Sequence, residues 1–181
     1  MSSIKFAEEL GAEYVLIHGG RIYHDYLVWE RIVSESWGKY LTNIESIRKR
    51  AEDYNIPIVI ENTTPSNNSN LIDNINALQK LIEELEKIQL VVDIGHLNLT
   101  SNVYDIEKAI RNKNFVEHLT GFHIHNNDGK RDLHQNYNKG QINYDRLKKN
   151  VFSKLKEKIY IAEVNTVEEG LEFKNFLEKV N

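Results

Sequence analysis

The feature that most constrains this chain is a series of five short apolar segments, each ending in a side chain that can bind a metal ion. The segments are YVLIH, PIVIE, LVVD, GFH and IYIAE, and their last residues are His18, Glu61, Asp93, His123 and Glu163. They start about 30 to 40 residues apart, the length of one strand, one loop and one helix. This alternation predicts an α/β fold in which parallel strands bring their ligand-bearing ends to one rim.

Helical periodicity fills the stretches between these segments. Ile4, Ala7 and Leu10 share one face of a first helix, and apolar residues three and four apart run from about residue 27 to residue 54. The same spacing predicts helices over residues 72–85, 104–110, 144–155 and 167–176. Residues 1–181 are therefore predicted to form one domain, and the Val, Ile and Leu content of its strands is typical of parallel strands covered on both faces.

Composition narrows the class of partner and of site. Lys and Arg number 23 against 27 Asp and Glu, a net charge of -4, which disfavours nucleic acid as a partner without excluding it. There is no cysteine, so any metal would have only nitrogen and oxygen ligands. No run approaches the ~20 apolar residues of a membrane span, and the first residues do not resemble a signal peptide. We expect a cytoplasmic protein with no membrane contact.

Two glutamates stand out because apolar neighbours should desolvate them. Glu61 ends IVIE and Glu163 ends IAE. A single glutamate at a strand end is usually solvated and inert, but a pair can hold a divalent cation. The same pair can stand on either side of a substrate carbon as acid and base.

The remaining candidates each have a plain structural explanation as well. Asp93 and His96 form D-x-x-H, which a helix N-cap followed by a loop histidine explains equally well. His123 and His125 alternate in FHIH and so point to the same side of a strand, where one of them could be a hydrogen-bonded core residue.

The loop after FHIH and the glycines after the first segment add further candidates. Asp132 and His134 form D-L-H, and His18 precedes two glycines that permit a sharp turn. Lys130 and Arg131 could contact an anionic group of a substrate, although a solvated loop explains them equally well. By contrast, two other histidines have no partner pattern and are interpreted as structural or surface residues, namely His24 and His118.

Taken jointly, the candidates are hard to explain as a chance distribution. Eight potential ligands fall at or just after the ends of five successive strand-like segments, whereas chance would also scatter them over helix surfaces. A mixture of imidazole and carboxylate ligands suits Zn²⁺, Mn²⁺, Co²⁺ or Mg²⁺.

Five segments of the chain resemble, in order, the xylose isomerase-like TIM-barrel superfamily. They are AEELGAEYVLIHGG, IPIVIENT, VVDIGH, FHIHNNDGKRDLH and IAEV. The most specific parts are D-x-x-H at Asp93 and the H-x-H at His123 that is followed by D-x-H at Asp132. That superfamily contains sugar isomerases and epimerases as well as endonuclease IV-type enzymes, which cut DNA at abasic sites.

The resemblance implies specific roles. In both branches a shared metal centre would consist of Glu61, Asp93, His123 and Glu163. In the epimerase branch the two glutamates would also exchange the substrate's proton through an enediolate, while His96 contacts the sugar. In the endonuclease branch additional zinc ions would be bound by His18, His96, Asp132 and His134.

The sequence departs from the family in two ways. Family loops commonly have H-x-H-D-N-D-G and later G-E-G, where this chain has H-I-H-N-N-D-G and N-K-G. In addition, a TIM barrel has eight strands in about 250 residues, so this chain corresponds to a partial barrel of about five strand-helix units that lacks the first three. Because the outer strands of such a sheet have unpaired edges, we expect a shortened chain, a homo-oligomer, or a second chain that covers the open side.

The favoured function is a metal-dependent isomerase or epimerase of carbohydrate metabolism that acts on a sugar or sugar phosphate through an enediolate. Glu61 and Glu163 are the predicted catalytic residues, and His96, His125 and Lys130 the predicted substrate contacts. The alternatives are an endonuclease IV-like, zinc-dependent abasic-site endonuclease, and an inactive metal-binding fragment.

Overall fold

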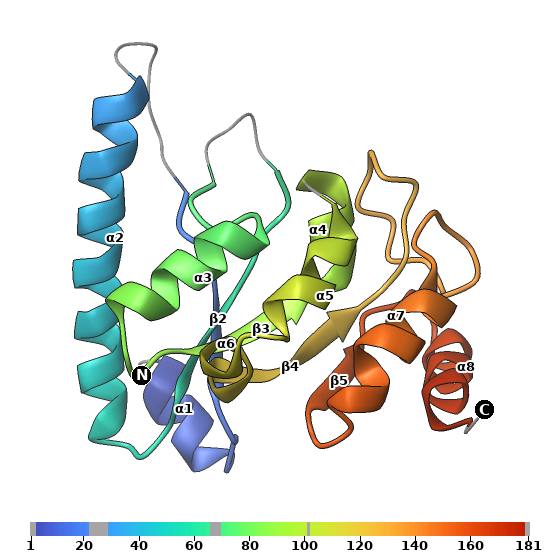
Figure 1. Ribbon diagram of the computed structural model, residues 1–181. Coiled ribbons are helices and arrows are strands. Elements are labelled where there is room, and N and C mark those ends of the chain that lie inside the picture. Colours follow the sequence, from blue (N-terminus) through green and yellow to red (C-terminus); the bar gives the residue numbers. More distant parts are fainter. Residues whose placement is uncertain (1–2, 22–28, 66–69, 101, 180–181) are drawn as a thin grey trace.

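The computed structural model describes residues 3–21, 29–65, 70–100 and 102–179. Its centre is one parallel sheet in the order β1-β2-β3-β4-β5, an arc in which consecutive strands are neighbours (Figure 1). The strands are β1 Val15–His18, β2 Ile58–Glu61, β3 Gln89–Asp93, β4 Leu119–Ile124 and β5 Ile159–Ala162. No pairing joins β1 to β5 within the described residues, so the predicted partial, open barrel of parallel strands is confirmed.

Helices follow the strands as predicted, with different boundaries. They are α1 Ser3–Glu9, α2 Trp29–Glu52, α3 Ile75–Glu84, α4 Ile94–Thr100, α5 Ile106–Ala109, α6 Lys113–His118, α7 Tyr144–Asn150 and α8 Val167–Glu178, with 3-10 turns η1 Val103–Asp105 and η2 Phe152–Lys154. The single helix predicted over residues 144–155 is wrong. Val151 leaves the helical conformation, with φ -121° and ψ -67°, and divides that stretch into α7 and η2.

The main core lies between the sheet and the helices. Outward-facing side chains of β2, β3 and β4 pack against buried helix residues; the strand residues are Ile58, Ile60, Leu90, Val92, Phe122 and Ile124. Since successive residues of a strand face opposite sides, Glu61, Asp93 and His123 all project from the other face of the sheet. Residue Asp93 pairs with His123 in the ladder, which places the two side chains next to each other.

The outer strands are less covered than the central ones. All residues of β2 are buried, whereas those of β1 and β5 are partly or fully exposed. Leu10, expected on the apolar face of the first helix, is 68% exposed, and Val167 and Leu171 in α8 are 76% and 56% exposed. Helical spacing predicted which residues share a face, but what covers that face depends on neighbouring elements.

Within the part of the chain that the structure describes, no helix combines the length and the apolar character needed to cross a membrane.

Candidate functional site

Four side chains converge at the carboxyl ends of the strands, and we call them the strand-end cluster: Glu61, Asp93, His123 and Glu163. Each offers one ligand atom, and these atoms all lie within 4.8 Å of one another. Nδ1 of His123 lies 2.7 Å from Oε1 of Glu61 and 2.9 Å from Oε1 of Glu163. The first three side chains come from β2, β3 and β4, and Glu163 directly follows β5. The four residues predicted as the shared metal centre therefore lie together.

Asp93 is held by its surroundings from two sides. The side chain of Asn62 accepts a hydrogen bond from the Asp93 N–H at 2.9 Å and donates one to the Asp93 carbonyl at 3.0 Å. Oδ1 of Asp93 accepts the His96 N–H at 2.7 Å, as an N-cap of α4 does. The N-cap interpretation of D-x-x-H thus describes the backbone correctly, but His96 belongs to the helix and not to a loop. Oδ2 of Asp93 is buried without a hydrogen-bond partner.

Within the described part of the chain, the carboxylates of the strand-end cluster have only histidines as cationic partners. Among the described residues, no Lys or Arg forms an ion pair with Glu61, Asp93 or Glu163. Burial lowers the pKa of His123, but hydrogen bonds to Glu163 and Glu61 outweigh burial and raise it to about 10. The hydrogen bond from His123 lowers the pKa of Glu163. A protonated imidazole thus balances part of the negative charge when no metal is bound.

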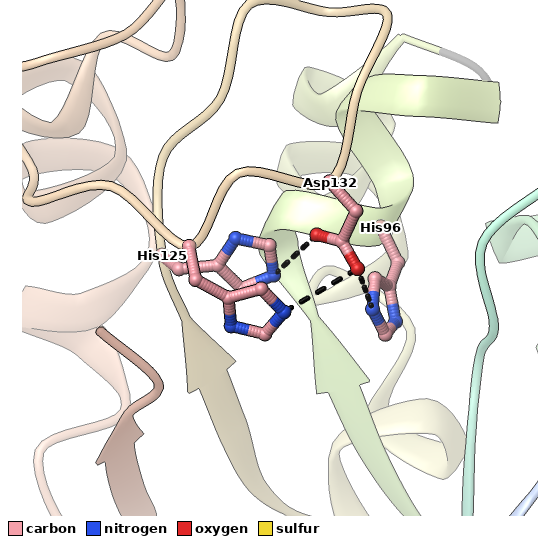
Figure 2. Close-up of side chains that lie close together, drawn as sticks. His96, His125 and Asp132 are labelled. Atoms are coloured by element: carbon pink, nitrogen blue, oxygen red, sulfur yellow. Dashed lines mark ion pairs between the residues drawn. The ribbon is translucent and has the colours of Figure 1, made fainter. Parts of the chain in front are cut away.

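A second group, which we call the loop cluster, consists of His96, His125, Asp132 and His134. Figure 2 shows the Asp132 carboxylate pointing between the rings of His96 and His125. Oδ2 of Asp132 lies 3.4 Å from Nε2 of His96 and 3.3 Å from Nε2 of His134, and its Oδ1 lies 3.6 Å from Nε2 of His125. Three of these residues were predicted as additional zinc ligands, and His125 as a substrate contact.

Main-chain carbonyls orient two rings of the loop cluster. Nδ1 of His96 lies 2.9 Å from the Asn62 carbonyl, and Nδ1 of His134 lies 2.8 Å from the Glu163 carbonyl. A hydrogen bond at Nδ1 leaves the Nε2 lone pair free, as in many metal-binding histidines. Both Nε2 atoms face Asp132, so the rings are arranged as ligands would be.

Charge in the loop cluster is balanced internally. Burial lowers the pKa of His96, but a hydrogen bond to Asp132 and the charge of Asp93 raise it to about 9. Burial raises the pKa of Asp132, yet hydrogen bonding to His96 and the nearby histidines bring it down to about 2. Without metal, this cluster contains an ion pair at neutral pH.

His125 links the two clusters. Its Nε2 lies 3.1 Å from Oδ1 of Asp93, and its ring stacks on His134 with centroids 4.1 Å apart. The ring occupies space that only a glycine leaves free, because a Cβ on Gly95 would lie 2.0 Å from its Cε1. The whole side chain is buried, and neither ring nitrogen has a partner in hydrogen-bond geometry.

Buried amides hold the loop that carries Asp132 and His134. Nδ2 of Asn126 donates to the carbonyls of Tyr137 and Ile142, and its Oδ1 accepts the N–H of Ile142 at 3.0 Å. Nδ2 of Asn127 donates to the Gly95 carbonyl at 2.8 Å and so ties the loop to α4. Sequence reasoning missed this function, although the departure from the family pattern at Asn126 pointed to it.

The other predicted contacts lie at the margin. Nε2 of His18 lies 3.2 Å from Oε2 of Glu61, with its side chain 66% exposed. Lys130 is exposed on the loop, whereas the Arg131 guanidinium pairs with Asp128 at 2.8 Å.

The two histidines interpreted as structural or surface residues have different outcomes. His118 lies part-buried at the end of α6, with Nδ1 2.6 Å from the Ile88 carbonyl, so it is structural as predicted. His24 falls outside the described residues.

Comparison with known proteins gives one family match. The family described as "Xylose isomerase-like TIM barrel" matches residues 1–177. Two uncharacterized proteins of Methanocaldococcus jannaschii are similar: MJ1614 is 26% identical over 148 residues, and MJ1311 is 30% identical over 158 residues. These alignments cover 82% and 86% of this chain but 53% and 50% of the relatives, so the chain spans about half their length.

Solved structures give the same picture of the fold. A D-tagatose 3-epimerase-like protein is 25% identical with a TM-score of 0.79, covering 97% of this chain and 64% of that one. L-ribulose 3-epimerase is 17% identical with a TM-score of 0.69, covering 98% and 58%. The IOLI protein with a bound zinc atom is 20% identical with a TM-score of 0.64, covering 94% and 59%.

Proposed function

Because this chain belongs to the xylose isomerase-like TIM-barrel family, we propose that it acts as a metal-dependent isomerase or epimerase of a sugar or sugar phosphate. Epimerases and an epimerase-like protein are among the structures that share its fold. The fold is compatible with many reactions, so the proposal depends on the site.

The observation that carries the proposal is the convergence of buried carboxylates in the strand-end cluster. Glu61 and Asp93 are buried with Glu163 beside them, and no Lys or Arg of the described residues pairs with any of the three. Buried negative charges are costly unless a cation compensates them. Three carboxylates and one imidazole form a donor set that suits Zn²⁺, Mn²⁺, Co²⁺ or Mg²⁺.

The unpartnered Oδ2 of Asp93 supports the same assignment. A buried carboxylate oxygen normally has a hydrogen-bond partner, and this one has none. A divalent cation bound by Glu61, Asp93, His123 and Glu163 would polarise a substrate carbonyl as a Lewis acid.

The two glutamates supply the proton transfer in this proposal. Glu61 and Glu163 reach the same nitrogen of His123 from opposite sides of β4, from β2 and from the residue after β5. One carboxylate takes the proton from the carbon next to the carbonyl and leaves an enediolate. The other, in its acid form, then gives a proton to the opposite face in an epimerase. The lowered pKa of Glu163 keeps it ionised at neutral pH, as a base must be.

Substrate contacts are assigned by position. Lys130 is exposed on the loop, and His96 borders both clusters, so we keep both as proposed substrate contacts. His125 is fully buried, with Nε2 3.1 Å from Oδ1 of Asp93, so we assign it to balancing the charge of Asp93 in place of the substrate contact first predicted.

Elemental analysis combined with deuterium exchange tests the proposal. The purified protein is expected to contain about one divalent ion, and to exchange the proton next to the carbonyl of a ketose or ketose phosphate in D2O, followed by NMR. Glu163→Gln should slow exchange by about 10³-fold, in line with the loss of a general base. Glu168→Gln, in the first turn of α8, is the matched control and should behave as wild type. A protein without metal, or unchanged exchange in Glu163→Gln, would contradict the proposal.

The loop cluster favours a second candidate, an abasic-site endonuclease of the endonuclease IV type. His96, Asp132 and His134 come together beside the strand-end cluster, and His18 adjoins Glu61. Two results together would favour the endonuclease over the isomerase or epimerase. They are three zinc ions per chain, and nicking of duplex DNA at an abasic site that Asp132→Asn abolishes. Metal without either activity would identify the third candidate, a metal-binding fragment.

The open edges of the sheet support a proposal about assembly. β1 and β5 have unpaired edges within the described residues, and Ile161 on β5 is 39% exposed. We propose that further strands, from this protein or from another chain, cover this side. Light scattering that shows a monomer with fully cooperative unfolding would argue against a covering chain.

A further inference from the structure

A cavity of about 1120 Å³ lies behind β4 and β5, on the face of the sheet opposite to the strand-end cluster. Its floor contains Ile124, Tyr160 and Ala162, and its walls include Phe152 of η2 and Leu177 of α8. Ile124 stands between His123 and His125, and Ala162 precedes Glu163. Because side chains alternate along a strand, the cavity and the strand-end cluster are back to back. The cavity is therefore separate from the proposed active site.

The other lining residues are mostly lysines. Five lysines line the cavity, against the two carboxylates of Asp145 and Glu178; the lysines are Lys148, Lys149, Lys156, Lys174 and Lys179. The lining therefore has an excess of three positive charges, although the whole chain has a net charge of -4. A positive lining on an acidic chain favours an anion as the occupant.

Three of these lysines are available to a ligand. Nζ of Lys148 donates to the main-chain carbonyls of Phe176 and Lys179, and Lys174 lies 3.8 Å from Glu178. Within the described residues, the structure gives no ion pair for the ammonium groups of the other three, which are Lys149, Lys156 and Lys179.

We propose that this cavity binds an amphiphilic anion, with one apolar chain and a carboxylate or phosphate head. The apolar floor suits an alkyl chain and not a sugar, and the free ammonium groups suit the head. Lys148 already joins α7 to α8 through its hydrogen bond to the Phe176 carbonyl, which favours a single alkyl chain over a partner helix about 10 Å wide. This inference goes beyond the proposed enzymatic function and does not depend on it.

Titration calorimetry with alkyl anions below their micelle concentrations tests the ligand class. Dodecanoate should bind at one site per chain, and each two-carbon shortening, to decanoate and then octanoate, should weaken binding about tenfold. Decanol, which keeps the chain without the charge, should bind at least about tenfold more weakly than decanoate. Dodecyl phosphate separates the two heads: tighter binding than dodecanoate would indicate a phosphate source, and weaker binding a fatty acid. Equal binding of decanol and decanoate, or no binding of any anion, would overturn the proposal.

Variants locate the binding site. Lys149→Ala combined with Lys156→Ala should weaken dodecanoate binding about tenfold and leave the metal content unchanged. Lys108→Ala combined with Lys113→Ala removes the same charge from α5 and α6, away from the cavity, and should leave binding unchanged. Leu177→Trp should block binding by filling the cavity. Dodecanoate binding should persist in Glu163→Gln, because Glu163 belongs to the strand-end cluster and does not line the cavity. If dodecanoate bound at the strand-end cluster instead, this substitution would change its affinity. Equal losses in both double variants, or loss in Glu163→Gln alone, would contradict the assignment.

Discussion

The strand-end cluster and the loop cluster contain the same kinds of side chain but are built differently. The first has three carboxylates and one imidazole, from the ends of successive strands. The second has three imidazoles and one carboxylate, from α4, the residue after β4, and the loop that follows. Strand register fixes the first group, whereas the second depends on how a loop folds back. The geometry of the strand-end cluster is therefore determined by the sheet, whereas that of the loop cluster is not.

The clusters also differ in charge. The strand-end cluster keeps excess negative charge even with His123 protonated, while in the loop cluster protonated His96 balances Asp132. A bound divalent cation is stabilised more strongly by carboxylates whose charge is not already balanced. At either cluster the cation must also displace a proton from a histidine. We therefore expect the strand-end cluster to bind a cation more tightly than the loop cluster.

The largest expected effect comes from Asp93, which adjoins both clusters. Asp93→Asn keeps an oxygen that can cap α4 but removes the charge, so zinc affinity should fall by more than about 100-fold, beyond the loss typical of an indirect partner. Asp93→Ala should lose as much affinity and about 1 kcal/mol more stability, because the cap is lost too. Competition with a chelator and urea unfolding measure the two quantities. If the Asp93→Asn protein bound zinc as tightly as the wild type, Asp93 would not be a zinc ligand.

The next effect tests whether Asn62 acts through Asp93. Asn62→Ala removes both hydrogen bonds to the Asp93 backbone and should lower zinc affinity about 10- to 100-fold. Asn138→Ala, at an exposed position of the loop after β4, is the control and should have no effect. An Asn62→Ala protein that is less stable but binds zinc normally would show that Asn62 is only structural.

The pH dependence of metal binding separates occupation of one cluster from occupation of both. The raised pKa of His123, about 10, means that its contribution to metal-free stability is complete below about 6.5 and is lost as pH rises through about 10. Zinc needs the neutral imidazole, so affinity should rise about tenfold per pH unit between about pH 7 and 9. Calorimetry in buffers of different ionisation enthalpy should record about one proton released per ion at the strand-end cluster. Release of more than one proton per protein chain would indicate that the loop cluster, where the pKa of His96 is about 9, also binds metal.

The smallest expected effect on the strand-end cluster comes from Gly95. Gly95→Ala places a methyl group where the His125 ring lies and should destabilise the protein by about 1–3 kcal/mol, measured by urea unfolding. Zinc affinity at the strand-end cluster should change only a few-fold, because Asn62 still holds Asp93. Gly38→Ala, on α2 with open space around its Cβ position, is the matched control and should not destabilise. A large loss of zinc in Gly95→Ala would show that the two clusters are not independent.

The sequence predicted the residues of the strand-end cluster better than it predicted the residues whose hydrogen bonds hold the site in place. The positions of Glu61 and Asp93 at the ends of PIVIE and LVVD were enough to predict that the two side chains gather at one rim, because the carboxyl ends of parallel strands lie at the same edge of a sheet. The supporting contacts join distant residues: Asn62 bonds to Asp93 across 31 positions, and Asn127 bonds to Gly95 across 32. A local pattern has no signal for such pairs, so these residues were missed.

The sequence by itself determined the order of strands and helices and the rim of the sheet at which the ligands gather, since both follow from local patterns along the chain. The tertiary structure alone decided that His125 joins His96, Asp132 and His134, that Val151 interrupts a helix, and that Leu10 and Val167 remain exposed. Those outcomes depend on which elements lie next to one another, and that is set by packing between segments far apart in the chain.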